Sequence, residues 1–267
     1  MSDFLKEMAK SSAQRAASVK VRAADLDRPV VPLELDGFDV IAELKSRSPA
    51  EGALGDANEP RAVRARRYAA GGAAAISVLT EPSRFDGALG HVSEVAAAVP
   101  QTPVMRKDFL VEPVQVMEAR AAGASGVLLI ATMLDDDKLR AMLDCAYEHQ
   151  LFVLLECFDD ADLDRAAALL ERAADAERAA SGRLLVGVNT RNLRTLDVDF
   201  GRLETLAPSL PAARCVAESG LATTADAAHV AGLGYRLALV GSALMRSDDP
   251  ASLITDMRRA GAESLAA

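Results

Sequence analysis

The chain has 267 residues, of which 50% are apolar and 26% charged, and its formal net charge at pH 7 is −9. This is the composition of an ordinary globular protein, its length fits one large barrel or two small domains, and its charge argues against nucleic acid as the main partner. No apolar run approaches the roughly 18 residues of a membrane span, and the first ten residues lack an apolar signal core. We therefore expect neither membrane association nor export.

The three cysteines, Cys145, Cys157 and Cys215, lie far apart and match no metal-binding spacing. Cys157 and Cys215 fall within apolar runs, where we expect them to be buried as small hydrophobic side chains. Unpaired cysteines are compatible with a reducing compartment, so we expect a cytoplasmic protein without a metal.

Eight short apolar runs predict strands that alternate with amphipathic segments of helical pattern. Continuous apolar strands separated by single helices indicate a parallel sheet that is buried on both faces. Eight such units in about 220 residues match a (β/α)8 barrel, and a doubly wound open sheet is the alternative. In chain order, the strands are expected at Val40–Lys45, Ala74–Thr80, Val104–Phe109, Gly126–Ala131, Phe152–Cys157, Leu184–Asn189, Arg214–Ser219 and Leu237–Gly241.

Polar residues stand at the C-terminal ends of these strands, where barrels of this class hold their active sites. Side chains alternate between the two faces of a strand, so Glu43 and Lys45 share a face. The same interpretation places two lysines, three glutamates and an asparagine at one level of the barrel mouth. Packing does not explain such a ring, because a buried unpaired charge costs several kcal/mol. Its members are Glu43, Lys45, Lys107, Glu156, Asn189 and Glu218.

The two lysines of this ring are informative because only six of the chain's 30 basic residues are lysine. Arginine stays protonated, whereas lysine can release a proton when its surroundings favour it. A lysine at a buried strand end therefore indicates proton chemistry or contact with a compact anion, and a solvated strand-end charge is the plainer alternative.

A phosphate site is predicted after the seventh and eighth strands, where many barrels bind phosphate at the start of a short helix. Gly220 and Gly241 would let backbone N–H groups approach the phosphate oxygens, and Ser242 opens the segment after the last strand. Ser48, after the first strand, would add a hydroxyl donor. Glycine also interrupts turns where no ligand binds, but its pairing at both strand ends favours phosphate.

Several segments carry a resemblance to a known family, among them five that each fall at a predicted strand end. The chain resembles indole-3-glycerol-phosphate synthase over about residues 38 to 258. The five segments are Ile41-Ala-Glu-Leu-Lys-Ser-Arg-Ser-Pro49, Val104-Met-Arg-Lys-Asp-Phe109, Gly187-Val-Asn-Thr-Arg-Asn-Leu193, Val216-Ala-Glu-Ser-Gly220 and Val240-Gly-Ser-Ala-Leu-Met-Arg246.

The resemblance implies a reaction in tryptophan biosynthesis that uses no cofactor and no metal. Its substrate is 1-(2-carboxyphenylamino)-1-deoxyribulose 5-phosphate, a phosphorylated adduct of anthranilate and ribulose. The product is indole-3-glycerol phosphate, and CO2 and water are released. The enzyme is thus a carboxy-lyase that acts on a small molecule.

The resemblance also implies roles for individual residues. Lys107 is the expected general acid for ring closure, Glu156 a proton-transfer partner, and Lys45 a contact for the anionic groups. Which lysine acts at which step stays open. Arg191 is expected to support the carboxylate end or the charge network of the active site. The remaining polar residues are expected to orient the hydroxyls and the anilino nitrogen, and they are Glu43, Asn189, Glu218 and Ser219.

Three structural expectations accompany these roles. Leu129 and Leu154 are expected to form an apolar floor for the benzene ring. Residues 1–37 are expected to be an N-terminal extension of a single barrel domain spanning 1–267, with a helix near Phe4–Val19 that folds over the mouth. The segment Glu171–Arg183 is expected to extend a helix on the side away from the mouth.

Other functions remain open at this level. Phosphoribosylanthranilate isomerase is disfavoured, because its chemistry is expected to use an acid/base pair of Cys or Asp with Asp rather than Glu43 and Lys45. A specialised-pathway paralogue would act on a modified anthranilate, and a sensor would bind a sugar phosphate without turnover. We expect a monomer or a weak homodimer.

Overall fold

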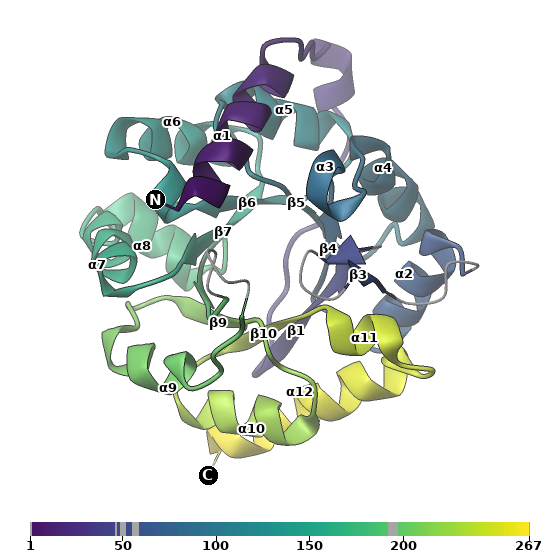
Figure 1. Cartoon of the computed structure of the whole chain (residues 1–267), viewed down its shortest axis with the longest axis vertical. Coiled ribbons are helices and arrows are strands. Elements are labelled where there is room, and N and C mark those ends of the chain that lie inside the picture. The colour runs from purple at the N-terminus through teal and green to yellow at the C-terminus, as the bar shows by residue number, and fades with distance from the viewer. Residues whose placement is uncertain (1, 46, 49–51, 55–58, 192–196, 267) are drawn as a thin grey trace.

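The protein is a closed barrel of eight parallel strands surrounded by helices (Figure 1). A computed structural model describes residues 2–45, 47–48, 52–54, 59–191 and 197–266, and the side chains of Ser48 and Ala53 are outside this description. The barrel strands are β1 (Asp39–Leu44), β4 (Ala75–Leu79), β5 (Val104–Lys107), β6 (Gly126–Ile130), β7 (Phe152–Cys157), β8 (Leu184–Asn189), β9 (Arg214–Glu218) and β10 (Leu237–Val240). The predicted (β/α)8 barrel is thereby confirmed, and each predicted strand end lies within two residues of the observed one.

The barrel closes because β1 pairs with both β4 and β10. Along each strand, alternate side chains face the surrounding helices or the barrel interior. In β7, for example, Val153 and Leu155 pack toward the helices, whereas Phe152 and Leu154 point inward. Both faces are buried, and this explains why the strands are continuously apolar in sequence.

The helices around the barrel follow the strands in order. They are α2 (Arg61–Ala70), α3 (Pro82–Phe85), α4 (Leu89–Ala98), α5 (Pro113–Ala121), α6 (Asp136–Glu148), α7 (Asp160–Leu169), α8 (Ala173–Ala180), α9 (Arg202–Leu206), α10 (Thr224–Gly232), α11 (Ser242–Arg246) and α12 (Pro250–Ala266). Short 3-10 turns are η1 (Ala23–Leu26), η2 (Ala131–Met133) and η3 (Ala207–Ser209), and β2 (Arg47–Ser48) pairs with β3 (Gly52–Ala53) in a small hairpin. None of the helices in these described stretches is long and apolar enough to cross a membrane.

The stretch Glu171–Arg183 is helical over Ala173–Ala180, as expected, but this helix is separate from the one before it. Helix α7 ends at Leu169, and α8 begins anew at Ala173. The buried carboxylate of Asp175 accounts for the separate helix, because it accepts hydrogen bonds from Arg140 and Arg178 and ties α8 to α6.

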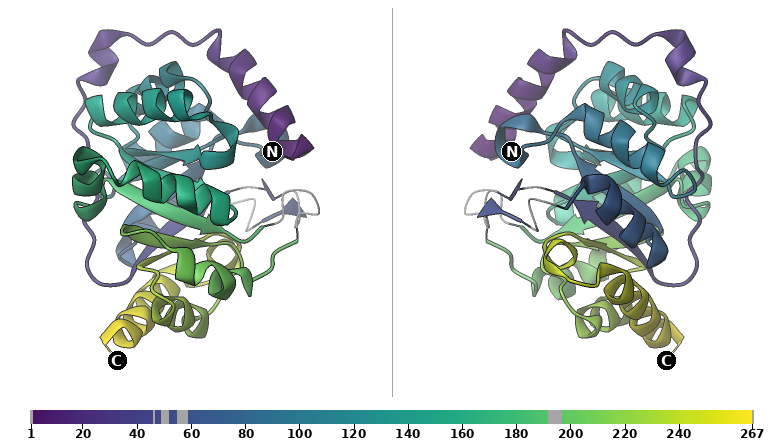
Figure 2. Two further views of the ribbon diagram at one scale, coloured as in Figure 1. Left: turned by 90° about the vertical axis from the view of Figure 1, so that its left-hand side faces the viewer. Right: turned by 90° about the vertical axis from the view of Figure 1, so that its right-hand side faces the viewer.

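The N-terminal helix α1 (Asp3–Ala16) lies at the mouth of the barrel, as expected. Ser2 caps it by accepting a hydrogen bond from the backbone N–H of Leu5. Leu5 and Met8 are buried in the same apolar cluster as Phe109, just beyond β5. Figure 2 shows α1 at the end of the barrel that also carries the β2–β3 hairpin, with residues 17–37 running along the outside to the opposite end.

Candidate active site

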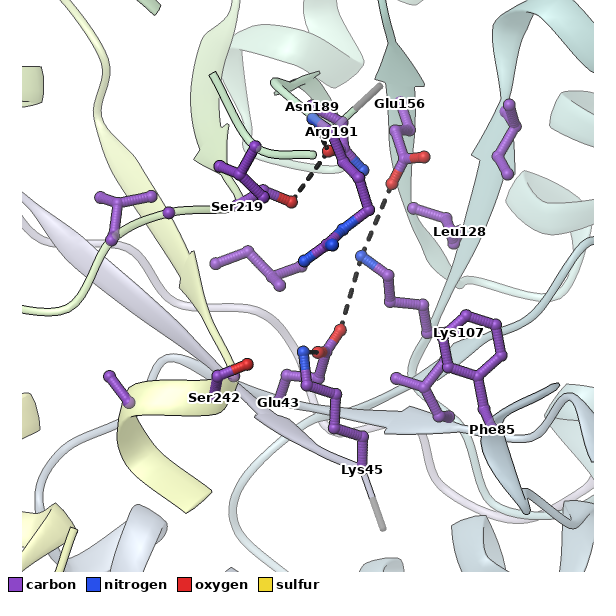
Figure 3. A pocket seen from close by; sticks show the side chains of 18 of the residues that line it. Glu43, Lys45, Phe85, Lys107, Leu128, Glu156, Asn189, Arg191, Ser219 and Ser242 are labelled. Carbon is purple, nitrogen blue, oxygen red and sulfur yellow. Dashed lines mark hydrogen bonds and ion pairs between the residues drawn. The ribbon is translucent and has the colours of Figure 1, made fainter. Parts of the chain in front are cut away.

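A cavity of about 530 Å³ opens at the C-terminal ends of the barrel strands (Figure 3). Eleven of the twelve residues predicted for the site fall within the described side chains, and ten of these line the cavity. They are Glu43, Lys45, Lys107, Glu156, Asn189, Arg191, Ser219, Gly220, Gly241 and Ser242. Glu218, the eleventh, is fully buried beneath it. The twelfth, Ser48, belongs to β2, and its side chain lies outside the described residues.

Lys107 stands at the centre of the charged groups. Its Nζ lies 3.0 Å from Oε2 of Glu218, 3.5 Å from Oε2 of Glu156 and 3.6 Å from Oε2 of Glu43. The carboxylates come from β9, β7 and β1, so three separate strands converge on one ammonium group. Lys45 completes the cluster with its Nζ 2.9 Å from Oε1 of Glu43.

Burial and pairing set the protonation of this cluster. Burial alone would lower the pKa of Lys107, but attraction from Glu218, Glu156 and Glu43 outweighs it and raises that pKa above its ordinary value. Burial raises the pKa of Glu218 to about 8; Lys107 opposes the rise and Glu156 adds to it. Glu43 differs, because Lys45 and Lys107 overcome the effect of burial and lower its pKa. The pocket therefore holds a lysine whose ammonium form is stabilised by carboxylates, beside a carboxyl whose pKa is raised by burial.

Asn189 connects the loops that follow β8 and β9. Its Oδ1 accepts hydrogen bonds from the backbone N–H of Arg191 and the hydroxyl of Ser219, each at 2.9 Å. Asn189 is itself buried, whereas Arg191 and Ser219 are partly exposed at the cavity surface. The amide thereby fixes the mutual placement of two groups that a substrate can contact.

The predicted phosphate end has a backbone suited to close approach. Ser219 and Gly220 have φ angles of 71° and 86°, and Ser242 begins α11 directly after Gly241. Gly241 also serves a second purpose, because a Cβ there would lie 2.5 Å from Oε1 of Glu43 and 3.0 Å from Nζ of Lys45. A side chain at this position would displace both charged groups.

The apolar side of the cavity differs from the expectation. Leu129 faces the helices and Leu154 lies deeper in the barrel, so neither lines the cavity. Leu128 and Ile130 of β6 line the cavity instead. Alternate residues of a strand face the same side, so the sequence could have indicated this pair.

Aromatic side chains that the sequence interpretation did not single out complete this wall. Phe109 follows β5, Phe4 comes from α1, and Phe85 comes from α3. The Phe109 ring centroid lies 5.7 Å from that of Phe4, edge to face, and 6.2 Å from that of Phe85. Phe85 reaches the mouth only through tertiary folding. A helix near Phe4–Val19 was expected over the mouth, but the sequence pattern does not show which of its side chains enters the cavity.

Comparison with known proteins identifies the family. The family model described as indole-3-glycerol phosphate synthase matches residues 6–257. The chain belongs to the indole-3-glycerol phosphate synthase family. An indole-3-glycerol phosphate synthase of Nocardioides sp. is 46% identical over 96% of this chain and 94% of its own length. Another, from Rhodococcus jostii, is 42% identical over 92% of this chain and 88% of its own length.

Solved structures of other proteins share the fold of this indole-3-glycerol phosphate synthase family member at low identity. One is 3-hexulose-6-phosphate synthase from Salmonella typhimurium, with a TM-score of 0.62, 16% identity, and coverage of 85% of this chain and 100% of that one. Another is thiamine phosphate pyrophosphorylase from Pyrococcus furiosus, with a TM-score of 0.57, 16% identity, and coverage of 85% and 97%. These likenesses concern the barrel alone.

Proposed function

We propose that this chain converts 1-(2-carboxyphenylamino)-1-deoxyribulose 5-phosphate to indole-3-glycerol phosphate at the cavity around Lys107. The observation that carries the proposal is the position of one lysine among three carboxylates, beneath a pocket with an aromatic wall and a glycine-containing rim. Membership of the family supplies the reaction type, and this geometry supplies the groups that the reaction needs.

The two ends of the substrate match two different sides of the cavity. The benzene ring packs against Phe85, Phe109 and Leu128, because an aromatic ring gains most from edge and offset contacts with other rings. The phosphate lies at the opposite rim, against the backbone around Gly220 and Ser242. The reacting carbonyl is thereby placed over the central lysine.

Proton transfer follows from that placement. As the ring carbon attacks the ribulose carbonyl, a C–C bond forms and Lys107 donates a proton to the oxygen that gains charge. Loss of CO2 returns the bonding electrons to the ring system. Lys45 then donates a proton to the hydroxyl group, which leaves as water. Glu156 accepts the proton that the intermediate releases in the same dehydration.

Neighbouring groups hold these reactants in place. Glu43 bridges the two lysines, with one oxygen on Lys45 and the other on Lys107. Glu218 orients Lys107 from below, and Asn189 holds Ser219 and Arg191 at the rim. Arg191 supports the substrate carboxylate before it leaves as CO2. Positioning of this kind lowers the barrier because the reacting atoms are already aligned.

The direct test is turnover of the purified protein with this substrate, followed by the fluorescence of the indole product. Lys107→Ala is expected to lower kcat by about 100-fold or more with a small change in KM, as for loss of a general acid. Lys107→Arg keeps a cation among the carboxylates but is a poor proton donor, so it should also be slow. Lys138→Ala is the control, because Lys138 pairs with Glu112 outside the cavity.

Three outcomes would redirect the proposal. Near-normal turnover by Lys107→Ala would remove this lysine from the chemistry. Tight binding of the substrate without product would favour a sugar-phosphate sensor. Turnover only with a ring-substituted substrate would favour a paralogue that acts on a modified anthranilate.

A further inference from the structure

The inward face of β8 contains a gap at the level of the catalytic cluster. Leu185 and Asn189 point into the barrel from this strand, and Gly187 stands between them without a side chain. In the strand register, Gly187 lies directly beside Glu156 of β7 and Val216 of β9. The gap is therefore next to one of the three carboxylates around Lys107.

The carboxyl of Glu218 occupies this gap. A Cβ built on Gly187 would overlap Oε1 of Glu218, and it would lie 3.1 Å from Cδ of the same side chain and 3.1 Å from Cδ1 of Leu154. Gly187 does not have a positive φ angle, so its backbone would accept any residue. The restriction at position 187 is therefore one of space.

The same carboxyl group makes the shortest contact to Lys107. While Oε1 lies over Gly187, Oε2 accepts a hydrogen bond from Nζ of Lys107 at 3.0 Å. Glu218 is fully buried. A side chain at position 187 would have to push the carboxyl away from Lys107.

We propose that Gly187 is a positioning residue, whose missing side chain forms the niche that holds the Glu218 carboxyl against Lys107. It acts through Glu218, because it has no group of its own to contact a substrate. The niche fixes the direction in which the Lys107 ammonium points toward the cavity. The catalytic part of this inference rests on the proposed function, whereas the niche itself is independent of it.

A second crowded glycine provides a matched control. Gly126 is the first residue of β6, at the end of the strand away from the cavity, and it also faces the barrel interior. A Cβ at this position would overlap the ring of Phe152. Replacing Gly126 or Gly187 with alanine therefore forces a side chain into filled barrel space. Only the replacement at position 187 meets a group of the charged cluster.

The first test is a stability comparison that involves no substrate. Gly187→Ala is expected to lower the urea midpoint strongly in the wild-type background and much less in the Glu218→Ala background, where the niche is empty. Gly126→Ala is expected to lower the midpoint equally in both backgrounds, because it does not contact Glu218. An equal loss for Gly187→Ala in both backgrounds would overturn the proposal.

Failure to fold is also informative in this scheme. If Gly187→Ala is insoluble but the double variant with Glu218→Ala folds, the conflict lies with the carboxyl and the proposal stands. If the double variant also fails to fold, Leu154 or the backbone sets the limit and the proposal is refuted.

The second test measures turnover. Gly187→Ala is expected to lower kcat by about 10- to 100-fold with less than about a threefold change in KM, because the substrate contacts remain while Lys107 is misdirected. Glu218→Asp shortens the side chain by one methylene group, so it should lower kcat in the wild type but raise it in the Gly187→Ala background. Gly126→Ala should leave kcat near the wild-type value.

The stability and turnover tests distinguish failure of the positioning role of Gly187 from failure of the proposed function. A wild-type kcat in Gly187→Ala, a rise in KM alone, or additive losses from Glu218→Asp would each refute the positioning role. A wild-type protein that does not turn over the substrate would refute the proposed function, and the stability comparison would still decide whether position 187 reserves the niche.

Discussion

Glu218 makes the stability of this protein depend on pH in a predictable direction. Burial raises its pKa to about 8 from an ordinary value of 4.5, although Lys107 opposes the change. Between these two pH values, the folded protein holds a proton at Glu218 that the unfolded chain has released. The free energy of unfolding therefore falls as pH rises through this interval, since the folded state binds more protons.

Glu218→Gln removes this titration while keeping the shape of the side chain. We expect the stability of the variant, relative to wild type, to increase from pH 5 to pH 8 by on the order of a few kcal/mol. Urea denaturation at intervals of half a pH unit measures this difference.

Glu43→Gln is the matched control for this measurement. Lysines 45 and 107 lower the pKa of Glu43, so its contribution is present above its ordinary pKa and is lost only in more acidic solution. Its stability difference from wild type should stay constant between pH 5 and pH 8. A flat difference for Glu218→Gln as well would show that Glu218 titrates normally.

Some residues of the site were predictable from the sequence, and others were not. The alternation of a strand was sufficient to predict that Glu43 and Lys45 share a face, and the predicted barrel brought Glu156, at another strand end, to the same cavity. The niche at Gly187 was not predictable, because the Glu218 carboxyl enters it from another strand. A helix near Phe4–Val19 was expected over the mouth, but Phe4 was not singled out as a cavity residue, because tertiary packing decides which side chain of that helix enters the cavity.

At the scale of elements, α1 is attached to the barrel next to Lys107. Nη2 of Arg15 donates to Oδ1 of Asp108 at 2.7 Å, and its Nη1 lies 3.5 Å from Oε1 of Glu81. Asp108 directly follows Lys107 and is buried. Phe4, at the other end of α1, lines the cavity, so the attachment connects the helix, the aromatic wall and the end of β5.

Arg15→Ala is expected to weaken this attachment in two measurable ways. Removing the charged hydrogen bond to a buried carboxylate should lower the free energy of unfolding by about 1–3 kcal/mol. KM should rise severalfold because Phe4 is held less firmly, while kcat changes less. Thermal unfolding and steady-state kinetics measure the two effects.

Lys6→Ala is the control on the same helix, because Lys6 pairs with the exposed Asp3. Such a surface change usually alters stability by less than about 0.5 kcal/mol. If Arg15→Ala matched this control in both measurements, α1 would have no part in forming the cavity.

Helix α11 offers a test of the phosphate end. Ser242 is the first residue of this helix and lines the cavity after Gly241. Ser242→Asp places a negative charge where the substrate phosphate is proposed to lie, so KM should rise by about 10-fold or more with a smaller effect on kcat. Ser247→Asp adds the same charge at the residue that ends α11, which does not line the cavity, and should change KM much less. Equal KM values for the two variants would show that the substrate phosphate does not bind at Ser242.

At the scale of the whole molecule, the barrel was predictable because each strand–helix unit has a recognisable local sequence pattern. A continuous apolar strand followed by an amphipathic helix repeats eight times, and the closure of β1 onto β10 completes the count. The break between α7 and α8 was not predictable, because Glu171-Arg-Ala-Ala-Asp175 contains good helix formers and neither Gly nor Pro. Asp175 of α8 pairs with Arg140 of α6, a tertiary contact that no local pattern shows.

The surface of the molecule predicts its state of association. Among the residues that the structure describes, the exposed large hydrophobic side chains are Val63 on α2 and Val198 at the cavity rim. Two isolated valines do not form the apolar patch on which stable oligomers depend. The formal net charge of −9 adds repulsion between copies. We therefore expect sedimentation equilibrium at micromolar concentration to give a mass near 28.1 kDa.

Varying the salt concentration distinguishes the two reasons for the expected monomer, charge repulsion and the lack of an apolar patch. At about 1 M salt, the Debye length falls to about 3 Å and repulsion between surface charges is largely screened. If charge alone keeps copies apart, the apparent mass should rise toward that of a dimer as salt increases. If the absence of an apolar patch is decisive, the mass should stay constant, and this is the result that the scattered valines predict. A stable dimer at low salt would contradict both explanations and would require a polar interface.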